Sequence, residues 1–270
     1  MGIDAKIIDS YLEEKSLDKV KNHWIFHSIS PSKYLFEEPL LEDYGLIKNT
    51  YKQIKKAFKT FKPLNLKLWE SIFGQYEGIP KTVSIYLVVG CPDPYDAMIR
   101  EDNNGNLSMI FDLAILSKYT KEPSKVYELI LQMITHELTH VYINNDYKDK
   151  TKNLSVHEKM KYIMFDEGFA HFLSYKKEVL TIDWEDENLI RKKKKAYSTL
   201  DYEMNNFIGE NEKDLLERSN SGPYWDKFGA LSGLFIIADY YISHDKDYKS
   251  IGELYKKGYN YMWEYWEMMK

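Results

Sequence analysis

The sequence predicts an α+β fold that is mostly helical and that contains a small antiparallel sheet. Apolar residues recur at helical spacing over most of the 270 residues, which favours helices. Residues 82–89 (TVSIYLVV) are rich in β-branched side chains, which is typical of a strand. The dipeptide Asn104-Gly105 is a strong hairpin-turn signal, and it lies between the short segments 97–100 and 107–111. We therefore expect the sheet in the middle of the chain, with helices before and after it.

The helices are expected where the apolar period of 3.6 residues is clearest. Two boundaries are marked by special residues, because Pro63 ends one helix and Gly222-Pro223 precedes another. A polar, lysine-rich loop is expected over residues 144–155. In chain order the expected helices cover residues 3–21, 40–61, 66–73, 126–145, 158–179, 183–205, 224–243 and 247–269.

The composition is that of a globular chain with room for a substantial core. Hydrophobic residues make up 44% of it. The character of the sequence changes at Pro80, where the helical pattern gives way to the predicted strand. This change predicts an N-terminal helical segment, residues 1–79, packed on a larger domain, residues 80–270. One continuous domain is the alternative.

Charge and the N-terminal sequence exclude several classes of partner. The formal net charge of −5 argues against a general nucleic-acid binder, and we interpret the basic run 191–195 as a solvated helix face. The single cysteine, Cys91, excludes an internal disulfide framework and suits a reducing compartment. The first residues lack the apolar segment of a signal peptide, and no run approaches 18 apolar residues. We expect a cytoplasmic protein that binds neither nucleic acid nor membrane.

The most informative stretch is His136-Glu137-Leu138-Thr139-His140, an H-E-x-x-H sequence within the expected helix 126–145. Residues four apart lie on one face of a helix, so His136 and His140 can direct two imidazoles at one point. Neutral imidazole is a good ligand for Zn²⁺. Glu137 lies beside them, where its carboxylate can take a proton from a water held by the metal. The pattern predicts a zinc site in which His136 and His140 are ligands and Glu137 is the general base.

A catalytic zinc ion takes three protein ligands and keeps one open position, so a third ligand is expected. The best candidate is Glu167, in Phe165-Asp166-Glu167-Gly168-Phe169-Ala170, on the next expected helix. The polar loop between the two helices would allow the second helix to turn back. Gly168 costs about 1 kcal/mol in a helix interior, so its presence predicts a close approach of another helix at this point.

These motifs carry a resemblance to a known family. H-E-x-x-H followed on a second helix by E-G-x-A resembles the gluzincins, zinc metallopeptidases whose third ligand is a glutamate. The block from Phe165 to Ala170 is similar to the N-E-G-F-A block of the zinc aminopeptidases. The resemblance covers roughly residues 82–240. It implies a zincin-like catalytic domain with the sheet before the H-E-x-x-H helix, and zinc bound by His136, His140 and Glu167.

The resemblance also implies a residue that stabilises the oxyanion. Gluzincins often supply a downstream Tyr or His that donates to the substrate carbonyl oxygen. Tyr224, which follows Gly222-Pro223, resembles the tyrosine of the tyrosine-lysine-glycine-alanine block in the aminopeptidases, although its spacing to Gly229 is two residues longer. Tyr224 is therefore the candidate, and a purely structural role for it is the alternative.

Two other residues bear on the ligand set. His171 lies one turn beyond Glu167 and could bind the metal, orient a ligand or be a simple core or surface histidine. Cys91 precedes His136 by 45 positions (136 − 91), and peptide deformylases resemble this order in having a cysteine ligand upstream of H-E-x-x-H. Their glycine-cysteine-leucine block is absent here, where Pro92 follows Cys91, so Glu167 is preferred.

The function that the resemblance implies is that of a zinc-dependent metallopeptidase, acting on a peptide or protein substrate. The G-x-M-E-N motif that binds the substrate amine in aminopeptidases is absent, so aminopeptidase specificity is not implied. Two alternatives remain open: a non-enzymatic binding or regulatory protein on a gluzincin scaffold, and another type of zinc amidohydrolase.

Overall fold

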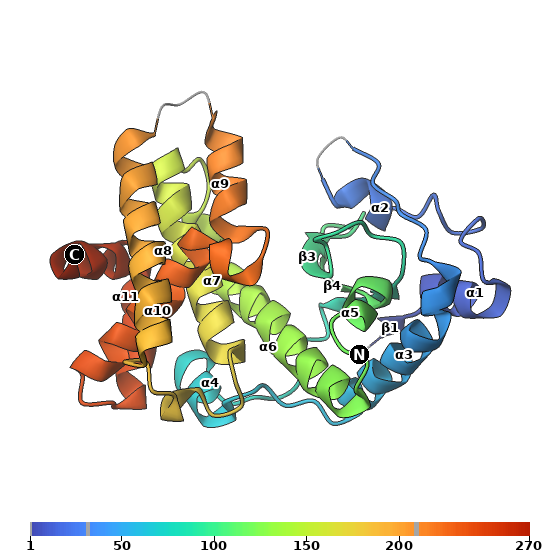
Figure 1. Ribbon diagram of the computed structural model, residues 1–270, viewed down its shortest axis with the longest axis horizontal. Coiled ribbons are helices and arrows are strands. Elements are labelled where there is room, and N and C mark those ends of the chain that lie inside the picture. Colours follow the sequence, from blue (N-terminus) through green and yellow to red (C-terminus); the bar gives the residue numbers. More distant parts are fainter. Residues whose placement is uncertain (1, 31–32, 208–210) are drawn as a thin grey trace. The chain divides into compact units, whose positions relative to one another are not determined.

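The computed structural model describes residues 2–30, 33–207 and 211–270. Its elements, coloured along the chain in Figure 1, confirm a mostly helical α+β chain. None of the helices in these ranges combines the length and the apolar character that crossing a membrane requires. The elements belong to two compact units, each built from two stretches of sequence. Unit 1 comprises residues 1–62 and 77–141, and unit 2 comprises residues 63–76 and 142–270.

Within the described residues, unit 1 contains a four-stranded mixed sheet. The strands are β1 (Ile3–Asp4), β2 (Ser84–Val88), β3 (Ala97–Glu101) and β4 (Leu107–Asp112). Their order is β1-β2-β4-β3, so that β1 and β4 each pair with β2 in parallel, whereas β3 and β4 form an antiparallel hairpin. The predicted hairpin is confirmed. The prediction that the whole sheet is antiparallel is wrong, because the other two strand pairs are parallel.

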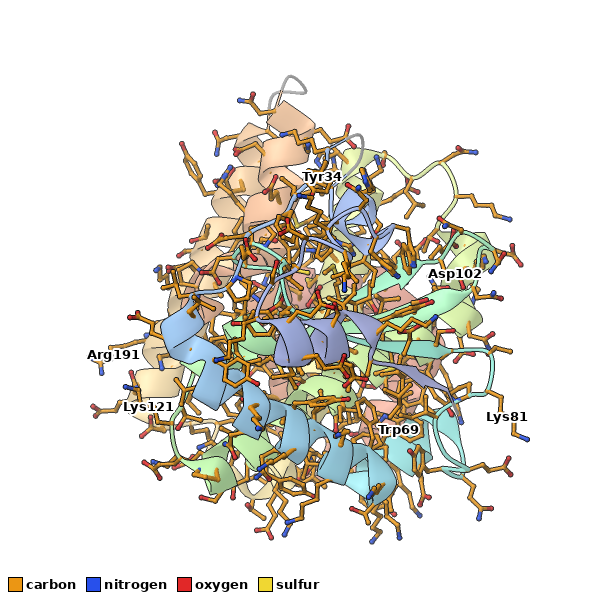
Figure 2. The ribbon with its side chains drawn as sticks, turned by 90° about the vertical axis from the view of Figure 1, so that its right-hand side faces the viewer. Tyr34, Trp69, Lys81, Asp102, Lys121 and Arg191 are labelled. Atoms are coloured by element: carbon orange, nitrogen blue, oxygen red, sulfur yellow. The ribbon has the colours of Figure 1, made fainter. Side chains whose placement is uncertain are left out.

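The connections explain why the sheet is mixed. After β2 the chain runs through residues 89–96 to the sheet edge, where β3 forms, and the following turn returns β4 to the place beside β2. Asp102, labelled in Figure 2, holds this turn by accepting the backbone N–H groups of Asn104 (2.8 Å) and Asn106 (2.9 Å). β4 is buried at five of its six positions, which suits a strand between two others.

The first helix is shorter at both ends than the periodicity predicts. Residues 3–4 form β1 on the edge of β2, and α1 (Lys6–Glu14) begins only after them. α1 ends where Lys15 adopts a left-handed backbone with φ of 54°. The expected helix over residues 3–21 is therefore correct only in its middle. The local apolar period cannot show that backbone groups at the edge of β2 are available to pair with residues 3–4.

The other helices of unit 1 pack against the sheet or lead away from it. Ile47, Ile54 and Phe58 are buried on one face of the third helix, and the Phe58 ring meets the Phe111 ring of β4 edge to face at 5.8 Å between centroids. The helices are α2 (Ile25–Ser28), α3 (Tyr44–Lys59), α5 (Leu113–Lys118) and α6 (Pro123–Tyr147), whose residues from Tyr142 onward belong to unit 2. The sequence did not predict α5.

Unit 2 is built from helices. They are α4 (Leu66–Phe73), α7 (Val156–Ser174), α8 (Glu187–Asn206), α9 (Glu212–Asn220), α10 (Phe228–Ser243) and α11 (Tyr248–Met269). Every α10 residue from Phe228 to Ala238 is buried, and α10 packs on α7, α8, α9 and α11. The central core of unit 2 is therefore formed around α10, as its continuous apolar sequence indicates.

Helix boundaries in unit 2 agree with the prediction for α4 and differ for α7. α7 begins two residues before the expected Glu158 because Ser155 and Glu158 form a capping box. In it the Ser155 backbone N–H donates to Glu158 Oε2 at 2.9 Å. The expected loop over residues 144–155 is shorter than predicted, since α6 continues to Tyr147 and a 3₁₀ turn follows. The sequence did not predict α9.

Two glycines set the crossing of α7 and α10. A Cβ atom on Gly168 would lie 2.7 Å from the backbone of Gly233, and one on Gly233 would lie 1.8 Å from the Met164 carbonyl oxygen. The two backbones are therefore in direct contact, which a larger residue at either place would prevent. Gly168 lies at a close helix approach, as predicted, but the helix that approaches it is α10 and not the H-E-x-x-H helix with which the prediction was concerned.

Replacing Gly233 by alanine is expected to destabilise unit 2 by about 3 kcal/mol or more, because the added methyl must push α7 and α10 apart. Urea unfolding followed by circular dichroism measures the change. Gly45 is the matched control: it lies in α3 with nothing within 4 Å of its Cβ position. Gly45→Ala should be neutral or stabilising by up to about 1 kcal/mol. Equal midpoints for the two variants would contradict the close crossing.

Asp112 is the last residue of β4 and the N-cap residue of α5, and its side chain is fully buried. Its Oδ1 accepts the backbone N–H groups of Ala114 (2.9 Å) and Ile115 (3.0 Å), and its Oδ2 accepts that of Cys91 (2.7 Å). These bonds stabilise the carboxylate, but burial has the larger effect and raises the pKa of Asp112 to about 6. Between pH 3.8 and about 6, the folded protein therefore keeps a proton on Asp112 that the unfolded chain has lost.

This raised pKa predicts a pH dependence of stability. Between pH 3.8 and about 6 the folded state binds more protons than the unfolded state, so the free energy of unfolding falls as the pH rises. The fall at Asp112 amounts to about 3 kcal/mol and is complete above about pH 7. Asp112→Asn cannot titrate, so the stability difference between wild type and variant should shrink by this amount across the window. A difference that is constant with pH would show that the Asp112 pKa is not raised.

Candidate metal centre

The H-E-x-x-H sequence lies on α6, in the part of the helix that belongs to unit 1. The Nε2 atoms of His136 and His140 are 3.0 Å apart, and the two rings meet edge to face with centroids 4.7 Å apart. The two imidazoles converge because four residues make about one turn of the helix. Their nitrogens thus present two ligand atoms side by side, as the sequence predicts.

Glu137 lies between the two histidines in sequence and is only 5% exposed. The hydroxyl groups of the neighbouring threonines form hydrogen bonds within the helix. Thr135 donates to the Leu131 carbonyl and Thr139 donates to the Thr135 carbonyl, each at 2.8 Å. Burying an ionised carboxylate is costly unless a positive charge compensates it. The surroundings of Glu137 therefore decide whether it can serve as a base.

Arg100, on β3, is a charged neighbour of Glu137 that the sequence did not reveal. Burial lowers the pKa of Arg100 below its ordinary value, whereas the Glu137 carboxylate raises it. The guanidinium also donates to the Ser28 carbonyl (3.0 Å) and the Ile29 carbonyl (3.1 Å), which hold it in place. A positive charge fixed near Glu137 favours its ionised form. In the sequence, this positive charge is visible only as an arginine at the end of the expected strand 97–100.

Unit 2 brings three of the other candidate residues together. Glu167 and His171 lie one turn apart on α7, with Glu167 Oε2 3.6 Å from His171 Nε2. Both side chains are largely buried, at 16% and 7% exposed. The His171 ring meets the Tyr224 ring edge to face, with centroids 5.1 Å apart. The proposed ligand, the histidine one turn away and the proposed oxyanion donor therefore form one cluster.

Tyr224 begins a short 3₁₀ turn, Tyr224–Asp226, just before α10. Its ring also contacts Trp225, at 4.8 Å between centroids, and lies 6.5 Å from the ring of Tyr175. Burial raises the pKa of Tyr224 above its ordinary value, so its hydroxyl keeps its proton at neutral pH. Tyr224 is thus a hydrogen-bond donor held among aromatic rings.

Cys91, the rival third ligand, lies in unit 1 in different chemical surroundings. Its side chain is 4% exposed, and its backbone N–H donates to Asp112. Burial, together with the Asp112 carboxylate, holds the pKa of the Cys91 thiol well above its usual value. Zinc binds the thiolate, so these surroundings oppose the form that a ligand needs.

Unit 1 therefore brings His136, Glu137 and His140 together, and unit 2 brings Glu167, His171 and Tyr224 together. No family model, curated protein or solved structure matches the chain. The gluzincin resemblance thus depends on the two short motifs alone and stays a prediction.

Proposed function

We propose that this protein is a zinc-dependent metallopeptidase. In this proposal His136, His140 and Glu167 hold the ion, Glu137 is the general base and Tyr224 stabilises the oxyanion. The observation that carries the proposal is the convergence of two imidazole nitrogens, 3.0 Å apart, beside a buried carboxylate.

The donor set on α6 fits a zinc ion. Two nitrogens that each lie about 2.0–2.1 Å from a tetrahedral zinc are about 3.3–3.4 Å apart. The His136 and His140 nitrogens, at 3.0 Å, need to separate by only a few tenths of an ångström to reach this spacing. Glu137 lies between them in sequence but cannot share their helix face, so in this proposal it acts on a water and is not a ligand. This pattern is what a catalytic zinc site needs, and a structural site would have no use for the base.

The helix itself supports a carboxylate ligand from α7. α6 is one continuous helix from Pro123 to Tyr147, and its last residues belong to unit 2. There the Tyr147 ring lies 5.0 Å, between centroids, from the ring of Phe165 on α7. Glu167 follows Phe165 by two residues. Within unit 2, the last turn of α6 therefore packs on the helix that carries the proposed third ligand.

The chemistry that zinc supplies when bound is the polarisation of water and of the substrate carbonyl. Glu137 accepts the proton of the attacking water and transfers it to the leaving amine, which requires an ionised carboxylate in the resting protein. Arg100 favours that ionised form. Tyr224 donates its hydroxyl hydrogen to the carbonyl oxygen as negative charge develops there. His171, 3.6 Å from Glu167, orients that carboxylate.

Glu137→Gln separates this proposal from the non-enzymatic alternative. It removes the base but no ligand, so hydrolysis of labelled casein should fall at least about 100-fold while zinc content stays near one ion per chain. Mass spectrometry under native conditions measures the zinc. Glu128→Gln, an exposed glutamate on the same helix, is the matched control and should retain full activity. A wild-type protein that carries no zinc when purified without chelator would refute the proposal.

Tyr224→Phe tests the oxyanion donor. The variant keeps the ring and its contacts with His171 and Trp225 but loses the donor, so kcat should fall by about 100-fold with little change in KM. Zinc content and the circular dichroism spectrum should stay unchanged. Tyr202→Phe, at an exposed tyrosine of α8, is the control. An unchanged kcat would assign Tyr224 a structural role.

A further inference from the structure

An open cavity of about 690 Å³ lies in unit 2, between the end of α7 and the first turns of α8. Its lining includes Tyr175, Lys176, Lys177 and Lys192, and we call it the lysine pocket. The turn that forms one wall is held by Asn65: its Nδ2 donates to the carbonyls of Leu173 (3.0 Å) and Lys176 (2.7 Å), and its Oδ1 accepts the Val179 N–H (3.0 Å). The wall is therefore fixed before any ligand enters.

The pocket lies along α7 from the proposed site. Glu167, His171 and Tyr175 are four residues apart, so they follow one face of the helix in successive turns. At 1.5 Å per residue, Tyr175 is about 12 Å along the axis from Glu167. Tyr224 and Trp225 connect the two places, because both contact Tyr175. An extended peptide advances about 3.3 Å per residue, so three or four residues span this distance.

The acidic residues that line the pocket are mostly engaged by backbone groups. Asp186 Oδ1 accepts the N–H groups of Asn188 (3.0 Å) and Leu189 (3.3 Å) at the start of α8. Asp183 Oδ1 accepts the Glu185 N–H at 3.1 Å. The positive end of the α8 dipole offsets the charge at Asp186. Glu178 is the remaining carboxylate of the lining, which also contains three lysines.

Two of the three lysines of the pocket lie over aromatic rings. Lys192 Nζ is 3.5 Å from the centroid of the Trp225 ring, and Lys176 Nζ is 5.7 Å from that of Tyr175. An aromatic face attracts an ammonium group but does not neutralise it, so both remain able to pair with an anion. Two other lysines of the basic run 191–195 differ, because Lys193 pairs with Asp239 at 2.8 Å and Lys195 pairs with Asp226 at 2.7 Å.

We propose that the lysine pocket binds an acidic side chain of the substrate, three or four residues from the scissile bond. Lys176 and Lys192 would pair with the carboxylate, and Tyr175 would form the wall towards the reacting site. This assignment rests on the proposed peptidase function for its place along the substrate, whereas the preference for an anionic group rests on the pocket alone. Arg191, which points away into solvent in Figure 2, takes no part.

The test is a binding comparison with the Glu137→Gln variant of the 270-residue chain, which does not consume its ligand. Two short dye-labelled peptides differ only in two adjacent glutamates or two glutamines at the same places. Fluorescence anisotropy should show about tenfold tighter binding of the glutamate peptide, as expected for a charge-assisted contact. The preference should weaken as salt is raised. It should be lost in the Lys176→Gln/Lys192→Gln double variant, and circular dichroism checks that this variant folds.

Lys194→Gln is the matched control, because Lys194 is exposed on the same helix and does not line the pocket. Equal affinities for the two peptides, or an equal loss in the Lys194 variant, would overturn the proposal. With the wild-type enzyme, cleavage of the glutamate peptide should occur three or four residues from the glutamates. A lysine-dependent preference without any hydrolysis would reject the peptidase function and the substrate position but leave the anion preference. Hydrolysis without the preference would reject the pocket assignment alone.

Discussion

The proposed site depends on how charge is compensated on an apolar helix. Glu137 is 5% exposed, and an ionised carboxylate at such a position costs several kcal/mol unless positive charge lies near it. The Arg100 guanidinium supplies one positive charge from β3. In the proposed site a divalent cation held by His136 and His140 supplies another. Together they explain how a helix with so much apolar surface can bury an acid beside two imidazoles.

The positions of the candidate residues in unit 2 depend on a single helix, α7. The contact of Gly168 with Gly233 fixes α7 against the buried helix α10. One face of α7 then carries Glu167, His171 and Tyr175 in successive turns, so the candidate ligand, its histidine neighbour and the wall of the lysine pocket are positioned by the same rigid element. A shift of α7 would move all three together. In the proposed peptidase, this shared helix would place Glu167 and the lysine pocket on one substrate-binding surface of unit 2.

The sequence predicted what local periodicity and turn chemistry determine. The bounds of α4, the β3–β4 hairpin and the burial of α10 follow from patterns that lie within one segment. The order of the strands did not follow, because the β-branched residues show that residues 82–89 form a strand and not which strand lies beside it. β1 was missed because its two residues gain their partners only from the edge of β2. Arg100 was missed because its nearness to Glu137 exists only in the folded chain.

In the proposed site, one zinc ion is held by two residues of α6 and one of α7. Anomalous scattering at the zinc absorption edge, measured on a crystal of the protein, tests it most directly. We expect one peak per chain, about 2.0–2.1 Å from Nε2 of His136, Nε2 of His140 and a carboxylate oxygen of Glu167, with one coordination position left for water. A peak elsewhere, or one at the histidines without Glu167 among its ligands, would contradict it.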